Sequence, residues 1–373
     1  MTLPELWENL ASLLALARQH EQGQGNREVS LMSREVVRGV TRASLSRRRL
    51  VAGAVAAGAV VVLPGGLRSV AAQDKPKIAF SVPGLNFPFF VHMMNLAQQH
   101  ADELGIELVQ LDGQENGAPS STKQSADLEA VIAQGIDGIV ISPNDGQALA
   151  PAIQAAIDAG VPVVTVDRNV PDADTLAHVG ADNVRGGEKQ AEYVLELLPD
   201  GGEIYELQGQ PGATPAIDRH KGLDNVLSKQ DKVKVIVSQT ANFARDEAVT
   251  VFESALAGNN PPAAVVAAND DMAFGVSEVA QANGLTMPII GFDALPEALI
   301  AIRDGKQAAT IEQFPGQQST TAMDILLAYL ADGTEPKEHD TYLEPILITK
   351  DNLADAERAV EAGVAEAAAT PTA

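Results

Sequence analysis

Cysteine is absent from this sequence of 373 residues. The chain can therefore form no disulfide and no thiolate metal site, and it has no cysteine nucleophile and no cysteine for a lipid anchor. The six histidines are scattered along the chain, so none of them forms a closely spaced pair of metal ligands. These absences remove several classes of catalytic and metal-binding protein.

The usual signatures of nucleotide-binding and hydrolytic sites are missing too. There is no P-loop and no G-x-S-x-G, and the first predicted strand is followed by VPGLNFPFF instead of G-x-G-x-x-G. Asp270 and Asp271 could bind a metal, but acidic residues at the predicted start of a helix more often cap it. Since no nucleophile with its base is found, we expect a protein that is not an enzyme and that needs no cofactor or metal.

Basic residues are few, with 26 Lys and Arg against 50 Asp and Glu. Without its first 73 residues the chain keeps 17 basic and 45 acidic groups, a net charge of −28. The negative electrostatic field of such a chain repels phosphate groups, so we expect no nucleic-acid partner.

Residues 1–73 read as an N-terminal extension that contains an export signal. Arg47 and Arg48 precede an apolar run, and the run ends near the small residues Val70-Ala71-Ala72. This order is typical of a cleaved secretory signal, and the arginine pair indicates the twin-arginine route to the periplasm. A membrane anchor is the alternative, but Pro64-Gly65-Gly66 breaks the run before the roughly 20 residues that a membrane span needs.

From residue 75 the pattern alternates between strands and helices joined by short turns, which predicts parallel sheets built from βαβ units. With 45% hydrophobic residues, the chain is long enough for about two domains. We expect an α/β fold of two doubly wound parallel-sheet lobes joined by a multi-strand hinge. The chain should cross between the lobes near Gln313 and again near Tyr342.

These crossings define the predicted domains. The first lobe comprises residues 74–181 and 314–342, and the second comprises 182–313 and 343–352. Helices predicted in the second half include 186–198 and 272–282, and residues 341–350 are predicted as a last strand. An Ala- and Glu-rich tail over 353–373 could extend a terminal helix.

Polar residues follow several predicted strands at the point where each ends. Asp167 and Arg168 follow PVVTV, Asn269 follows AAVVAA, Asp293 follows MPIIGF and Gln313 follows AATIE. One such pair alone would be read as a loop salt bridge. Because ligands of open α/β sheets bind beyond the carboxyl ends of the strands, the repetition predicts a binding site for a polar ligand.

From residue 75 to about 350, the chain resembles the ribose-binding group of periplasmic sugar-binding proteins, which are components of ABC importers. The matching segments occur in order along the chain: NFPFF, VVTVDRN, HVGADNVRGG, YELQGQPG with IDRHKG, ANFARDEA, AANDDMAFG, IIGFDALPE and ATIEQFPGQ. The resemblance implies a type I periplasmic binding protein fold and a site that closes on a sugar. Carried over residue by residue, the implied ligand-binding residues are Phe89, Phe90, Asp167, Arg168, Arg219, Phe243, Asn269, Asp293 and Gln313.

These residue types suit a monosaccharide on physical grounds as well. Carboxylates accept, guanidinium groups donate and amides do both, so together they can satisfy hydroxyl groups, and Phe rings can stack on apolar C–H faces. Taken singly, Phe89 and Phe90 could instead be core residues of their helix, and Arg219 would be read as a surface charge.

Phe87 departs from the ribose-binding pattern, which has Asn at this place. A ring replaces a hydrogen-bonding amide, so we include Phe87 in the predicted site and leave the ligand open among a pentose, a hexose and a polyol such as inositol.

The resemblance implies a monomeric periplasmic receptor whose partners are its sugar, the membrane permease of an ABC importer and, as an open possibility, a chemoreceptor. A ligand-sensing regulator of the lactose-repressor type shares the two-lobe core, but it needs a DNA-binding segment where this chain has its apolar run. A sugar-processing enzyme is the third interpretation, and it lacks a catalytic constellation.

Overall fold

A computed structural model describes residues 75–366, so the predicted export signal and the last residues of the tail lie outside the described part of the chain. The first lobe is built on a six-stranded sheet in the order β13-β7-β6-β5-β1-β2, in which every pairing is parallel. Its strands are β1 (Lys77–Val82), β2 (Glu107–Asp112), β5 (Gly138–Ile141), β6 (Val163–Val166), β7 (Ala177–Ala181) and β13 (Asp340–Leu343).

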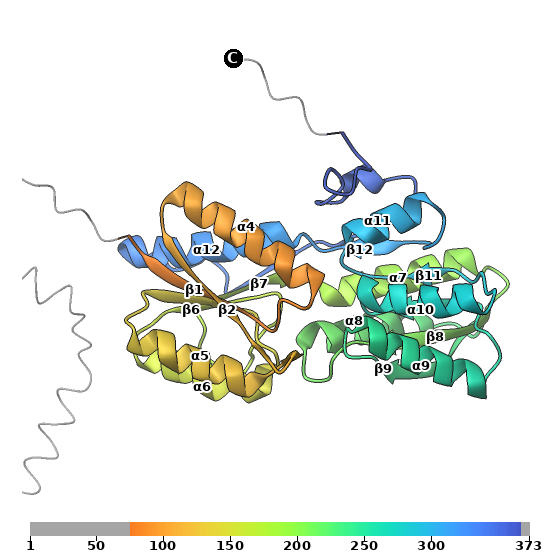
Figure 1. Ribbon diagram of the computed structural model, residues 1–373, viewed down its shortest axis with the longest axis horizontal. Coiled ribbons are helices and arrows are strands. Elements are labelled where there is room, and N and C mark those ends of the chain that lie inside the picture. Colours follow the sequence, from red (N-terminus) through yellow and green to blue (C-terminus); the bar gives the residue numbers. More distant parts are fainter. Residues whose placement is uncertain (1–74, 367–373) are drawn as a thin grey trace, which may run out of the picture. The chain divides into compact units, whose positions relative to one another are not determined.

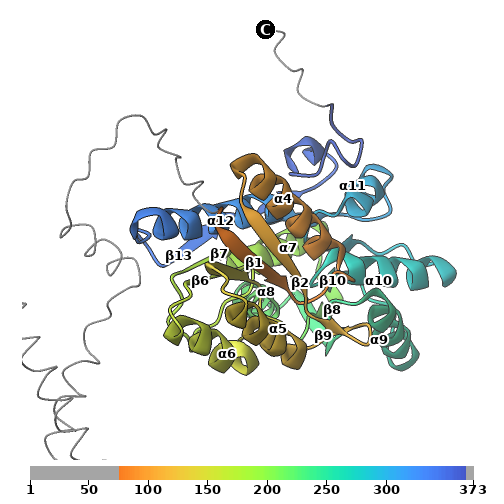
Figure 2. The same cartoon turned by 60° about the vertical axis from the view of Figure 1, so that its left-hand side comes forward.

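Helices cover both faces of this sheet. In both views α4 and α12 lie on one side, with α5 and α6 on the other (Figure 1, Figure 2). Alternating side chains divide β1 between the two faces: Phe80 packs in one cluster with Met93 and Leu326, and Ala79 packs in another with Leu149. The helices are α4 (Pro88–Leu104), α5 (Ser121–Ala133), α6 (Gly146–Asp158) and α12 (Pro315–Asp332).

The second lobe has a four-stranded parallel sheet in the order β11-β10-β8-β9. Its strands are β8 (Gly202–Gln208), β9 (Val233–Thr240), β10 (Ala264–Ala267) and β11 (Ile289–Ile290). Its helices are α7 (Asn183–Leu197), α8 (Thr214–Leu227), α9 (Arg245–Gly258), α10 (Asp270–Ala282) and α11 (Pro296–Arg303). The predicted α/β fold with two parallel-sheet lobes is confirmed.

The chain passes between the lobes three times. It leaves the first sheet between β7 and α7, returns between β12 (Thr310–Glu312) and α12, and leaves again between β13 and β14 (Ile346–Ile348) (Figure 1). β12 and β14 pair antiparallel with each other, and a bridge between Ile290 and Ala309 places them beside β11. These short segments form the hinge.

Several predicted elements need correction. The predicted strand over residues 341–350 is two strands in different sheets, β13 and β14, separated by Glu344 and Pro345. α7 begins at Asn183 and not at 186, since the side chain of Asp182 accepts from the amide of Arg185 and caps the helix. Strand β7 and the hairpin of β3 (Gln114–Glu115) and β4 (Ala118–Pro119) were not predicted.

The tail also differs from the prediction. Over its described part it forms a 3₁₀ turn, η1 (Leu353–Asp355), followed by turns, and no α-helix extends through residue 366. Within residues 75–366, every helix is too short or too polar to span a membrane.

Candidate functional site

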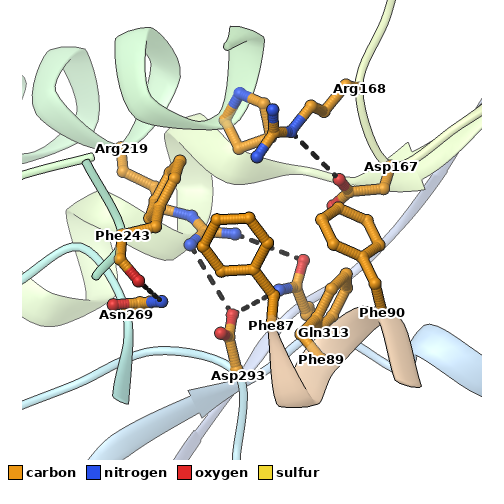
Figure 3. A pocket seen from close by; sticks show the side chains of 11 residues that line it. Phe87, Phe89, Phe90, Asp167, Arg168, Arg219, Phe243, Asn269, Asp293 and Gln313 are labelled. Atoms are coloured by element: carbon orange, nitrogen blue, oxygen red, sulfur yellow. Dashed lines mark hydrogen bonds and ion pairs between the residues drawn. The ribbon is translucent and has the colours of Figure 1, made fainter. Parts of the chain in front are cut away.

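A pocket lies between the two lobes, with about 330 Å³ of space free of protein atoms, part of which is open to solvent. All ten residues predicted from the sequence line it, and Pro215 is the eleventh (Figure 3). Three come from the start of α4, two follow β6, and the others lie on α8 or at the ends of strands in the second lobe. The predicted residues are Phe87, Phe89, Phe90, Asp167, Arg168, Arg219, Phe243, Asn269, Asp293 and Gln313.

The backbone is strained where it presents three of these side chains. Asp167, Phe243 and Asp293 have φ angles of 61°, 62° and 106°, a region that residues other than glycine seldom occupy. Such conformations cost on the order of 1–3 kcal/mol each and persist where the surrounding structure fixes them. Their concentration at the pocket indicates that it is a functional site.

Arg219 is the most extensively bonded side chain of the pocket, and only 4% of it is exposed. It therefore is not the surface charge that its helical position alone would suggest. Its Nε donates to Asn183 Oδ1 at 2.8 Å, one Nη donates to the carbonyl of Ala268 at 2.6 Å, and the other donates to Gln313 Oε1 at 3.3 Å. The guanidinium group also stacks on the ring of Phe292, 3.6 Å from its centroid.

Asp293 lies beside this guanidinium group. One of its oxygens is 3.6 Å from Arg219 Nη1 and accepts from Gln313 Nε2 at 2.6 Å (Figure 3). Burial raises the pKa of the Asp293 carboxyl well above its ordinary value, and the charge of Arg219 opposes that shift. Only one Asp293 oxygen has these partners, so the other can accept from a ligand.

Asp167 and Arg168 form the corresponding pair on the first lobe. Their closest charged atoms are 3.8 Å apart, and Asp167 also accepts from the hydroxyl of Ser142 at 3.2 Å. Burial raises the pKa of Asp167 and lowers that of Arg168 to about 10, which leaves the guanidinium group charged at neutral pH. Two cations thus face two acidic groups, a balance that suits a neutral polar ligand.

Each of the two amides of the site accepts one hydrogen bond and donates one within the protein. Asn269 caps α10, since its Oδ1 accepts from the amide of Met272 at 3.0 Å, and its Nδ2 donates to the carbonyl of Phe243 at 3.1 Å. Gln313 joins Arg219 to Asp293 through its two amide atoms. Both amides therefore fix their neighbours as well as facing the pocket.

Four Phe rings supply the apolar wall. Phe90 packs edge-on against Phe89 and Phe87, with ring centroids 5.1 and 6.1 Å apart, and Phe243 faces them from the second lobe (Figure 3). The guanidinium group of Arg168 lies 5.5 Å from the ring centroid of Phe90 and 5.7 Å from that of Phe243. Phe89 and Phe90 belong to the core cluster as well, so both sequence interpretations of these rings apply.

The lobes also touch beside the pocket residue Arg168, through residues that the sequence did not indicate. Gln210, in the loop before α8, donates to Asn144 Oδ1 at 2.8 Å and accepts from Arg168 Nη1 at 3.3 Å. The amide of Asn169 donates to the hydroxyl oxygen of Thr214 at 3.0 Å. Arg168 therefore contacts residues of both lobes, Asn144 of the first and Gln210 of the second.

Pro215 and Asn183 were also missed as site residues. Pro215 stands at the start of α8, where proline is an ordinary helix-initiating residue and gives no sign of a ligand. Asn183 acts through Arg219, and only the fold brings the two together. No sequence signal could have identified that contact.

Asp270 and Asp271 do not line the pocket, and the cap of α10 is Asn269 instead of either Asp. Asp270 is fully buried and accepts from the amide of Leu295 and from Gln307. Among residues 75–366, no group of three or more His, Asp or Glu side chains could hold a metal ion.

Comparisons with known proteins agree with this geometry. Residues 78–335 match the family model of the periplasmic binding protein domain. The ribose import binding protein RbsB of Bacillus subtilis is 37% identical over 253 residues, which cover 67% of this chain and 81% of that protein.

Solved structures show the same fold. The Caulobacter myo-inositol binding protein bound to myo-inositol is 38% identical, with a TM-score of 0.73 over 76% of this chain and 97% of that one. A periplasmic solute binding protein of an ABC transporter from Actinobacillus succinogenes, with bound D-allose, is 28% identical with a TM-score of 0.70, over 74% and 98% of the two chains. The two lobes, the pocket between them and the extent of these matches lead to one conclusion: this chain belongs to the periplasmic binding protein family.

Proposed function

We propose that this protein captures a monosaccharide or a cyclic polyol between its two lobes and delivers it to the membrane permease of an ABC importer. The observation that carries the proposal is a pocket lined from both lobes by two Arg, two Asp, two amides and four Phe. This set can satisfy several hydroxyl groups at once while rings cover the apolar faces of the ligand. The names of the relatives, which mention ribose, myo-inositol and D-allose, support the same class of ligand.

Each polar residue has a proposed role. Asp167 and Asp293 accept from ligand hydroxyls through the oxygens that the protein leaves free, and Arg168 and Arg219 donate to hydroxyl or ring oxygens. Asn269 and Gln313 complete the network. Phe89, Phe90 and Phe243 enclose the ring of the ligand, and Phe87 replaces an amide with an apolar wall.

The balanced charges of the pocket favour a neutral ligand over a sugar acid or a sugar phosphate. An added anion would leave the pocket with an uncompensated buried charge, which is costly in free energy. Among neutral ligands, the ring of Phe87 favours one with a broad C–H face or with one fewer hydroxyl at that corner.

A binding protein without catalytic activity is favoured over the two other interpretations. The family relatives carry the names of binding proteins, and both acidic groups of the pocket are paired with an Arg side chain. A DNA-binding regulator is disfavoured by the acidic composition of the chain.

The remaining proposals concern the cellular setting. We propose that the protein works in the periplasm as a monomer and reaches it by the twin-arginine route, on the strength of Arg47 and Arg48 ahead of the apolar run. A chemoreceptor that recognises the closed form is a second partner consistent with this setting.

Isothermal titration calorimetry with ribose, allose, xylose, galactose and myo-inositol tests the proposal. We expect one of these ligands to bind with a Kd in the micromolar range or below. The bound ligand should be recovered chemically unchanged after incubation with the protein. Glucuronate and ribose 5-phosphate serve as charged controls and should not bind. Absence of binding by every neutral ligand, or turnover of one of them, would refute the proposed function.

A further inference from the structure

The segment that follows β14 lies beyond residue 335, where the family match ends, and it packs on the second lobe. Ala356, Ala359 and Ala362 are buried in one hydrophobic cluster with Ala294, Leu299 and Ile348 of that lobe. Ala294 directly follows the pocket residue Asp293 in the sequence. The small side chains thus let the segment pack closely against the loop that carries Asp293.

The same segment reaches the first lobe through Glu357. Its carboxylate accepts from the amides of Gly316 and Gln317, at 2.8 and 3.0 Å, in the first turn of α12. Its Oε2 also lies 3.3 Å from His92 Nε2 on α4. A carboxylate at a helix N-terminus is favoured by the unpaired amides and by the helix dipole.

The acidity of Glu357 agrees with this arrangement. Burial tends to raise its pKa, but the hydrogen bonds from His92, Gly316 and Gln317 outweigh burial and lower it. The side chains of His92 and Glu357 are only 15% and 20% exposed, so water screens their contact weakly.

The backbone of Glu357 is tied to the hinge itself. Its amide donates to Glu312 Oε2 at 2.8 Å, and Glu312 Oε1 accepts from the amides of Gln313 and Phe314 at 2.8 and 2.6 Å. Gln313 lines the pocket, and Phe314 has a φ of 57° where the chain crosses between the lobes. Two carboxylates therefore hold the backbone of this crossing in place.

We propose that residues 352–364 are a strap that joins the two lobes behind the pocket, and that Glu357 is its positioning residue. This inference rests on the proposed function. Through His92 the strap holds α4, which carries Phe89 and Phe90 one turn earlier, and through Gly316 and Glu312 it holds the junction that carries Gln313. Its Ala face holds the loop of Asp293, so the strap fixes pocket residues of both lobes relative to one another.

The strap thereby affects ligand affinity without touching the ligand. A strap that favours the lobe arrangement seen here lowers the free-energy cost of closing the cleft, and weakening it should raise Kd. A tail that only adds stability would change the melting temperature and leave Kd unaffected.

The test compares full-length Glu357→Gln, His92→Gln and the double variant with wild type. Glu129→Gln, an exposed acidic position on α5, is the matched control. Calorimetry with ribose and with myo-inositol gives Kd, solution scattering gives the radius of gyration of the ligand-free protein, and hydrogen exchange reports on the amides of residues 313–318.

We expect Glu357→Gln to raise Kd by roughly five- to tenfold, to increase the radius of the ligand-free protein and to speed exchange at 313–318. His92→Gln should have a smaller effect in the same direction, and the two effects should not add because the residues contact each other. Glu129→Gln should match wild type in all three measurements.

A lowered melting temperature of Glu357→Gln with unchanged Kd and radius of gyration would contradict the proposed role of the strap. If Glu357→Gln does not fold, His92→Gln still decides the question, because it removes only the contact to α4. If the wild type binds none of the five neutral ligands named above, the proposed function is refuted, whereas the radius of gyration and the exchange rates still test the strap.

Discussion

Each charged residue of the pocket has a neighbour of opposite charge and little water around it. Arg168, Arg219, Asp167 and Asp293 are all at most 5% exposed, and each retains some hydrogen-bonding capacity toward the cavity. Charge-assisted hydrogen bonds in such surroundings are about twice as strong as neutral ones. The energetic contribution of one of these residues to ligand binding should therefore be measurable by a single substitution.

Truncation of Arg168, or neutralisation of Asp293, should weaken ligand binding strongly. We expect Arg168→Ala and Asp293→Asn each to cost on the order of 1.5–3 kcal/mol of binding free energy, since a ligand hydroxyl then loses its charged partner. Asn is preferred to Ala at 293 because it tolerates the φ of 106°. Calorimetry measures the effect, circular dichroism checks the fold, and exposed Asp304→Asn is the control. Full affinity in both variants would place the site elsewhere.

Phe87 offers a test of ligand selectivity. It is 6% exposed, lines the pocket and occupies the N-cap position of α4 without a capping side chain. Phe87→Asn should shift preference toward ribose and narrow the range of ligands, because a site built to bond a hydroxyl discriminates more strongly than an apolar wall. Asn also suits an N-cap, which offsets part of the lost packing.

The measurement is calorimetry of both forms against ribose, allose, xylose, galactose and myo-inositol. An unchanged rank order together with a lower melting temperature would show that Phe87 acts only in the core of the lobe.

At the scale of elements, the hinge strand β12 is unusual because its last residue, Glu312, is fully buried without a cation bonded to it. Three backbone amides donate to its carboxylate, yet burial and the charge of Glu357 raise its pKa to about 7. In the unfolded chain the ordinary value is 4.5. Protons therefore bind this residue more tightly in the folded state.

The stability of the protein should accordingly depend on pH through Glu312. Between about pH 4.5 and 7 the unfolded chain has released this proton and the folded chain has kept it, so the contribution of Glu312 to stability falls as pH rises and is constant above. Glu312→Gln removes this slope, and the variant should gain stability relative to wild type as pH rises from 4.5 to 8. Urea unfolding at several pH values measures it, and a difference that is constant with pH would contradict the shifted pKa.

Elements were predicted well where residue pattern alone determines them. The strand ends that carry Asp167, Asn269 and Asp293 are local in this sense, because each follows a run of apolar residues in the sequence. Strand β7 escaped prediction because AHVGA contains Gly and His and too few β-branched residues to signal a strand. The division of residues 341–350 depends on which sheet accepts each half, and that is a tertiary effect.

The back of the pocket could not be predicted for a similar reason. Glu357 and His92 are far apart in the sequence and belong to no motif, and Glu312, although it lies in the matching segment ATIEQFPGQ, gave no sign of a contact with Glu357. An Ala- and Glu-rich tail favours a helix by propensity, but here its alanines are buried against Ile348 and Leu299 in successive turns. Packing overrides propensity at this place.

For the whole molecule, the two lobes should move apart in the absence of ligand. Hydrogen bonds join the lobes through Asn144, Gln210 and Arg168, and a bridging ligand adds to these contacts. Saturation at about 100 times Kd should stabilise the protein by roughly 2.7 kcal/mol, and solution scattering should show compaction.

Gln210→Ala should reduce that compaction and speed ligand release, because the link between Arg168 and the second lobe is lost. Gln210→Glu keeps an acceptor for Arg168 and should restore part of the affinity. Stopped-flow dissociation rates compare the three proteins, and equal rates would show that Gln210 is not part of closure.

The path of the chain through the hinge also determines the order in which the two lobes can fold during synthesis. The first lobe begins to form at β1, but α12 and β13, which cover one face of its sheet and complete its edge, are synthesised only after almost the whole second lobe. Until then Met93 and Val164 lack the cover of Met323 and Leu326. The first lobe of a nascent chain therefore stays incomplete while the second lobe is synthesised. A chain released before α12 is made exposes an apolar face of the first sheet, which favours aggregation or binding by chaperones.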